Sequence, residues 1–141
     1  MGNENRELLK ETKPGHPHPQ HVLLIDDEPV VREIGCEMLE SLGYQCIPAE
    51  TGEEGIQLYQ ENKDKIAAVI LDIEMPGISG DKVFSKLKEL DSDLKVLLIS
   101  GYARNYLETK YFKRKLNPAI FMPKPFQLEQ LSKKLESIMG A

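Results

Sequence analysis

VLLIDD at residues 22–27, IAAVILD at residues 66–72 and VLLIS at residues 96–100 are the stretches that decide the fold of this chain. Each is an uninterrupted apolar run that ends on a polar residue. Such a run predicts a strand buried on both faces, as in a parallel sheet covered by helices on each side. Two shorter runs, at residues 44–48 and 119–122, predict two further strands.

Helical patterns alternate with these five predicted strands. Apolar residues recur every three or four positions after Pro29, Thr51 and Gly80, and again near the end of the chain. A basic stretch, residues 104–115, predicts the remaining helix. Five strands alternating with five helices, joined by right-handed crossovers, predict a doubly wound (βα)5 fold of the α/β class. Ligands of such folds bind beyond the carboxyl ends of the strands.

The length and charge of the chain favour one domain outside the membrane. It has 141 residues and a net charge of −5, which fits a single domain. We expect the proline-containing residues 1–20 to form a linker or tail, and residues 21–141 to form the domain. The longest purely apolar run has six residues, 66–71, whereas a membrane-spanning helix needs about 20. We therefore expect no membrane contact.

The beginning of the chain lacks the apolar core of a secretory signal, which favours a cytoplasmic location. In that compartment the two cysteines, Cys36 and Cys46, are predicted to be reduced and buried.

Charge is distributed unevenly along the chain. Residues 22–100 carry 17 acidic and 7 basic side chains, whereas residues 101–141 carry 3 and 8. The overall acidity argues against direct nucleic-acid binding through charge. The basic residues 104–115 have two interpretations: a solvated helix face, or a surface that binds a partner.

Five polar residues stand at the ends of the predicted strands: Asp26, Asp27, Asp72, Ser100 and Lys124. Each alone could be structural, because strand-end acids often cap helices or turns. Parallel strands, however, bring all five to one rim of the sheet. Clustered carboxylates favour a hard cation such as Mg²⁺. An aspartate nucleophile, with a lysine and a serine for the phosphoryl oxygens, suits phosphoryl transfer.

Four stretches now carry a resemblance to a known family: LIDDEP at 24–29, LDIEMPGISG at 71–80, LISGYA at 98–103 and FMPKPF at 121–126. From about His21 to Met139, the chain resembles the receiver (CheY-like) domain of two-component response regulators. The resemblance implies a flavodoxin-like three-layer sandwich, whose five-stranded sheet has the strand order 2-1-3-4-5.

The resemblance also implies roles for single residues. Asp72 is then the phosphoacceptor, and Lys124 and Ser100 assist it. Mg²⁺ or Mn²⁺ is held by Asp72 itself and by three other groups: Asp27 directly, Asp26 through water, and the backbone carbonyl of Glu74. Ser100 and Phe121 form the switch pair, and the Lys124–Pro125 peptide bond is cis.

The implied function is a signalling domain rather than an enzyme. It receives a phosphoryl group from a phosphohistidine on a histidine kinase or a histidine phosphotransfer protein. A homodimer through the face of the fourth helix, fifth strand and fifth helix is also implied. The chain could be a single-domain regulator, or a receiver from a hybrid sensor histidine kinase, whose parent protein would then be a kinase.

Two other functions are considered. A haloacid-dehalogenase-like phosphatase also uses an aspartate and Mg²⁺, but there the nucleophile follows the first strand. Here the acid pair comes first, and Asp72 follows the third strand. A degenerate receiver that only binds partners would usually have lost one of the site residues.

Overall fold

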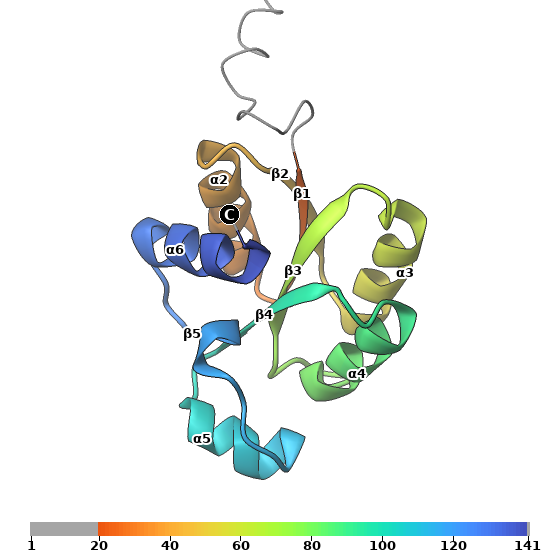
Figure 1. The fold of residues 1–141 in the computed structure, drawn as a ribbon, viewed down its shortest axis with the longest axis vertical. Helices are drawn as coiled ribbons and strands as arrows, with labels where there is room; N and C mark the ends of the chain where they lie inside the picture. Colours follow the sequence, from red (N-terminus) through yellow and green to blue (C-terminus); the bar gives the residue numbers. More distant parts are fainter. Residues whose placement is uncertain (1–19, 141) are drawn as a thin grey trace, which may run out of the picture.

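The computed structural model describes residues 20–140, so the linker predicted at residues 1–20 lies almost wholly outside the described residues. Five parallel strands form one sheet in the order β2-β1-β3-β4-β5 (Figure 1). Their bounds are β1 His21–Ile25, β2 Gln45–Ala49, β3 Ile66–Asp72, β4 Lys95–Ser100 and β5 Phe121–Pro123. The predicted fold class and strand order are confirmed.

Helices cover both faces of this sheet. Their bounds are α2 Pro29–Ser41, α3 Gly52–Asn62, α4 Gly80–Leu90, α5 Arg104–Leu107 and α6 Leu128–Met139. Figure 1 shows α2 and α6 together on one side of the sheet and α3 and α4 on the other. Between residues 20 and 140, no helix has both the length and the apolar character that crossing a membrane requires.

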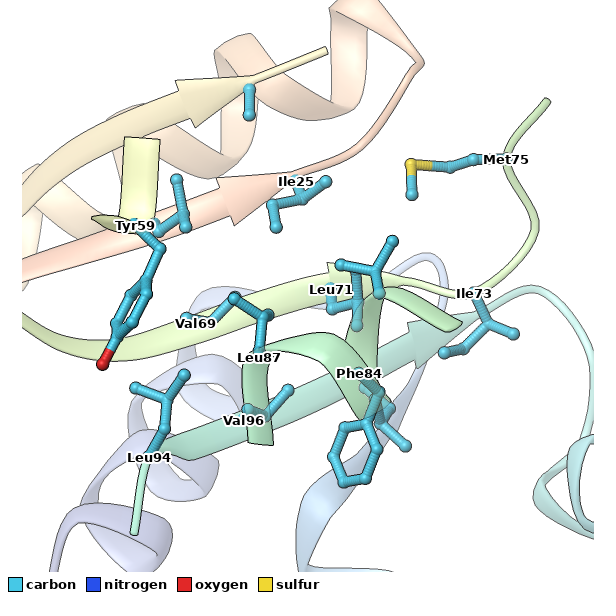
Figure 2. Close-up of a cluster of buried hydrophobic side chains, with 14 of the residues drawn as sticks. Ile25, Tyr59, Val69, Leu71, Ile73, Met75, Phe84, Leu87, Leu94 and Val96 are labelled. Atoms are coloured by element: carbon cyan, nitrogen blue, oxygen red, sulfur yellow. The ribbon is translucent and has the colours of Figure 1, made fainter. Parts of the chain in front are cut away.

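The apolar strands supply two cores, one on each face of the sheet. Along β3, Val69 and Leu71 face the α3–α4 side, while Ala68 and Ile70 face the α2–α6 side. Figure 2 shows the first of these clusters, in which Leu71 lies close to side chains from α4. Because successive residues of a strand point to opposite faces, a continuous apolar run is what two covered faces require.

The basic segment does not form the single helix predicted over residues 104–115. The α-helix α5 ends at Leu107 and continues as a π-helical turn, η1 Glu108–Phe112, which stops at Lys113 in the left-handed conformation with φ of 58°. The chain after Lys113 is held against η1 by the amide of Leu116, which donates to Oε2 of Glu108 at 2.7 Å. Leu116 itself is buried in the core beyond this turn.

The last strand is also shorter than predicted. A 3₁₀ turn, η2 Pro118–Ile120, takes up the first half of the segment predicted as a strand, residues 119–122, and pairing with β4 begins only at Phe121. Proline fits the first position of a helical turn, because its fixed φ is helical and its missing N–H is not needed there. The Asn117 side chain caps this turn by accepting from the amide of Ala119 at 2.9 Å.

The prediction of reduced, buried cysteines is wrong. Cys36 on α2 and Cys46 on β2 form a disulfide, with their Cα atoms 5.3 Å apart, and both residues are partly exposed. The close approach of α2 to the sheet explains this pairing. Gly35 lies so near Leu24 that a Cβ atom there would come within 2.7 Å of the leucine Cδ2. A larger residue would have to displace the buried end of the Leu24 side chain.

Candidate functional site

The structure brings the five predicted residues to the carboxyl ends of four strands. Asp26 and Asp27 follow β1, Asp72 ends β3, Ser100 ends β4, and Lys124 follows β5. These strands lie side by side in the sheet. The chain leaves β1 for β2 on one side, whereas β3, on the other side of β1, leads on to β4, so the switch point of this doubly wound sheet lies between the ends of β1 and β3.

Three carboxylates converge at the centre of this rim. Asp26, Asp27 and Asp72 each offer one oxygen, and these oxygens lie within 4.8 Å of one another. Asp26 and Asp72 are buried, and Asp27 is partly exposed. Burial, and then the charge of Asp26, raise the pKa of Asp72 to about 8. Burial likewise raises the pKa of Asp26.

One buried oxygen of this cluster has no partner in the protein. Oδ1 of Asp72 makes no hydrogen bond among the described residues. A buried carboxylate oxygen without a donor is costly, and like charges in close proximity raise that cost further. A divalent cation bound by oxygen ligands would lower both the cost of the unpartnered oxygen and the repulsion between the carboxylates. The possible ligands here are all oxygens. The cluster therefore fits a divalent cation.

Lys124 lies at the edge of the carboxylate cluster. Its Nζ is 3.2 Å from Oδ2 of Asp26, 3.5 Å from Oδ2 of Asp72 and 2.9 Å from Oε1 of Glu28. Burial alone would lower the pKa of Lys124, but the hydrogen bond with Glu28 and the two aspartate charges outweigh it and raise that pKa. The Lys124–Pro125 bond is cis, as predicted.

Glu28 was not assigned a role from the sequence. It is the residue before α2 and the closest carboxylate to the Lys124 ammonium. The available signal was its position directly after Asp26 and Asp27.

The structural alternative for Asp27, a cap on the following helix, does not hold, because the residue at the start of α2 is Glu28 and its side chain makes no capping hydrogen bond.

Ser100 is wholly buried, and its hydroxyl is already engaged. It donates to the carboxylate of Glu74, with Oγ 2.8 Å from Oε1 and 2.9 Å from Oε2. The same Oγ accepts from the amide of Tyr102 at 2.9 Å. Sequence reasoning assigned the backbone carbonyl of Glu74 to the cation and did not predict this side-chain contact. Phe121, the predicted switch partner of Ser100, packs in the core on the α3–α4 side and is 9% exposed.

Backbone contacts fix the loops that carry these side chains. The amide of Lys124 donates to the carbonyl of Ser100 at 2.8 Å, and that of Ile73 to the carbonyl of Ile99 at 3.1 Å. Gly80 closes the loop after β3, where a Cβ atom would come within 2.5 Å of Ile73 Cα and 2.7 Å of the Asp72 carbonyl oxygen. Only glycine permits this approach of α4 to the end of β3.

An apolar groove opens beside Lys124, between the start of α2 and the loop after β5. Its volume is about 400 Å³, and most of its lining is apolar. Val30 and Ile34 of α2 line it and are 64% and 46% exposed. The groove therefore places uncovered apolar surface directly next to the carboxylate cluster.

Comparison with known proteins finds one family over most of the chain. The family described as response regulator receiver domain matches residues 22–136. Over 122 residues, 84% of this chain, the sequence is 34% identical to the sensor kinase CckA of Brucella abortus (strain 2308), and over 121 residues, 86% of this chain, it is 30% identical to the response regulator MprA of Mycobacterium sp. (strain KMS). The chain spans 12% and 51% of those two proteins.

Solved structures show the same fold. The response regulator TrrA of Thermotoga maritima, in complex with Mg²⁺ and BeF, is 30% identical with a TM-score of 0.71, and the receiver domain of the hybrid histidine kinase CckA is 28% identical with a TM-score of 0.68. Each comparison covers 84% of this chain and 98% of the other.

Proposed function

This chain belongs to the response regulator receiver domain family, and from that premise we propose that Asp72 is its phosphoacceptor. A receiver domain is a signalling domain of two-component systems that takes up a phosphoryl group. The observation that carries the assignment to Asp72 is its unpartnered, buried Oδ1 at the centre of the rim. Asp26 lacks this feature, because one of its oxygens accepts from the amide of Glu28 and the other from Lys124.

The donor is a phosphohistidine of a histidine kinase or a histidine phosphotransfer protein. An oxygen of Asp72 attacks phosphorus, the phosphorus–oxygen bond forms as the phosphorus–nitrogen bond breaks, and the imidazole leaves with the electron pair. The Nζ of Lys124 lies 3.5 Å from Oδ2 of Asp72. Its ammonium group is therefore close enough to bind an oxygen of a phosphoryl group on Asp72. The Ser100 hydroxyl offers a second donor once it leaves Glu74.

A divalent cation completes this site, and we assign it as Mg²⁺, with Mn²⁺ as a substitute. Asp27 and Asp72 would hold it directly, Asp26 through water, and the backbone carbonyl of Glu74 would add a further ligand. When bound, the cation balances the negative charge that develops on the transferring phosphoryl group. The protein contributes a fixed arrangement of oxygen ligands. Two of the carboxylates that supply them, those of Asp26 and Asp72, are buried.

Location and assembly are proposed on the same premise. The domain acts in the cytoplasm, where histidine kinases phosphorylate receivers, and it does not catalyse a reaction on a separate substrate. The parent protein is either a single-domain regulator or a hybrid histidine kinase. A homodimer would use the face of α5, β5 and α6.

Phosphorylation by a small donor tests the acceptor. The protein is incubated with phosphoramidate and Mg²⁺, and its intact mass is followed for the wild type, Asp72→Asn and Asp93→Asn, an exposed control before β4. We expect one phosphoryl group on the wild type and the control and none on Asp72→Asn. An Asp72→Asn variant that gains the same mass would refute the assignment and show that another residue is the acceptor. An unmodified wild type would also refute it and leave the binding-only receiver as the explanation.

Cation binding is tested separately. Titration of the wild type and Asp27→Ala with Mg²⁺ in a calorimeter should show a large loss of affinity in the variant. Equal affinities would remove Asp27 from the site.

A further inference from the structure

The contact between Ser100 and Glu74 joins two segments that are 26 residues apart in the sequence. Ser100 ends β4 and is wholly buried, while Glu74 lies in the loop after β3 and is partly exposed. Both carboxylate oxygens lie within hydrogen-bond distance of the serine Oγ, at 2.8 and 2.9 Å. The hydroxyl is therefore centred on the carboxylate.

A serine hydroxyl has one proton and can donate one hydrogen bond at a time. That proton is committed to Glu74, and the amide of Tyr102 occupies a lone pair of the same oxygen. A hydroxyl bonded to an ionised acceptor is held more strongly than one bonded to a neutral acceptor. Ser100 therefore cannot donate to a phosphoryl group on Asp72 until it leaves Glu74.

We propose that Glu74 is a positioning residue that holds the Ser100 hydroxyl away from Asp72 in the unphosphorylated domain. The proposal rests on the function proposed above. Formation of the acyl phosphate then moves one hydrogen bond, from the Glu74 carboxylate to a phosphoryl oxygen, with no further covalent change. The free energy of the broken contact opposes phosphorylation, so Glu74 lowers the affinity of the site for a phosphoryl group.

A different action of Glu74 must be separated from this one. Its negative charge also acts on Asp72, where it contributes to the raised pKa after burial and the charge of Asp26. An effect through charge would reach Asp72 whether or not residue 100 carries a hydroxyl. An effect through the hydrogen bond between Ser100 and Glu74 requires that hydroxyl. Variants at both positions therefore distinguish the two.

The hydrogen bond from the amide of Tyr102 to the Ser100 hydroxyl offers an independent way to detect the release of Ser100. The ring of Tyr102 lies against that of Tyr106, with centroids 4.7 Å apart, and both side chains are exposed. When Ser100 moves, the amide of Tyr102 loses its present acceptor, and we expect the ring pair to shift with it. The chemical shifts of these two rings, observed by NMR, report the release directly.

The probe for the test is beryllium fluoride with Mg²⁺, which mimics an acyl phosphate on an aspartate without turning over. Its affinity is measured by calorimetry for the wild type, Glu74→Ala, Glu74→Gln, Ser100→Ala and the Glu74→Ala/Ser100→Ala double variant. We expect Glu74→Ala to bind about tenfold more tightly, as the loss of a charge-assisted hydrogen bond predicts. Glu74→Gln, which keeps an acceptor but not the charge, should gain about threefold.

The double variant decides between the two actions. If Glu74 acts by holding the Ser100 hydroxyl, the double variant binds beryllium fluoride no more tightly than Ser100→Ala. In a Ser100→Thr background, which keeps a hydroxyl, Glu74→Ala should still increase the affinity. A gain that persists in the Ser100→Ala background, or no gain in Glu74→Ala, overturns the proposal while leaving Asp72 as acceptor. A folded wild type that binds no beryllium fluoride overturns the proposed function, and this proposal with it. Circular dichroism confirms that each variant is folded.

Discussion

Replacement of Asp72 by asparagine should make the domain more stable at alkaline pH when no divalent cation is present. Burial, followed by the charge of Asp26, raises the pKa of Asp72 to about 8 in the folded protein, from an ordinary value of 3.8. The folded state therefore keeps the proton to a higher pH than the unfolded state. Stability conferred by the protonated form is fully present below about pH 4 and is lost as the pH rises toward 8.

The size of this loss follows from the shift. Each pKa unit corresponds to about 1.4 kcal/mol, so a rise from 3.8 to about 8 sets a ceiling of about 6 kcal/mol on the change in unfolding free energy. Asp26 and Asp72 lie within one cluster and titrate as a pair, which spreads the loss over both groups. We therefore expect Asp72→Asn to remove about half of the ceiling, or about 3 kcal/mol.

Urea unfolding followed by far-ultraviolet circular dichroism suits a chain that contains no tryptophan. Wild type, Asp72→Asn and the exposed control Asp93→Asn are compared between pH 5 and 8 with a chelator present. The wild type and control should lose stability as the pH rises, and Asp72→Asn should lose about half as much. Added Mg²⁺ should restore the wild type at pH 8, because it binds only the folded state. Parallel pH profiles for wild type and Asp72→Asn would refute the reasoning.

Two further predictions concern the scaffold. Reduction of the Cys36–Cys46 disulfide, which closes a loop with a sequence separation of 10, should cost about 3 kcal/mol, seen as a lower urea midpoint in dithiothreitol. Cys46→Ser should be insensitive to dithiothreitol, and a wild type equally insensitive would contradict the estimate. Gly80→Ala should cost about 2–3 kcal/mol by overpacking against the backbone of β3 and weaken Mg²⁺ binding. Gly101→Ala, whose methyl group meets nothing within 4 Å, should change stability by less than about 0.5 kcal/mol.

The position of the site could be predicted from the sequence because it depends on where strands end. Apolar runs fixed by burial on both faces stop at Asp26, Asp72 and Ser100, and parallel pairing alone then brings these residues to one rim. No knowledge of side-chain conformation is needed for that step. The same reasoning placed Lys124 after β5, although the strand itself is shorter than predicted.

The contacts that depend on side-chain direction could not be predicted. Glu74 and Glu28 are polar residues in loops, and nothing in their spacing says that one reaches Ser100 and the other Lys124. The disulfide depends on how closely α2 approaches β2, and the spacing of the two cysteines in the sequence does not give that distance. The early end of α5 likewise depends on a side chain, Glu108, that accepts from an amide eight residues away.

The hydrogen bond between Lys124 and Asp26 spans 98 positions of the chain. During synthesis on the ribosome, Asp26, Asp27 and Asp72 emerge well before the residues of β5. A nascent chain can therefore gather its carboxylates but lacks the ammonium group that lies beside them until nearly the whole domain has been made. Assembly of the complete site is in this way tied to completion of the sheet, and a chain truncated before β5 would retain the acidic residues but not Lys124.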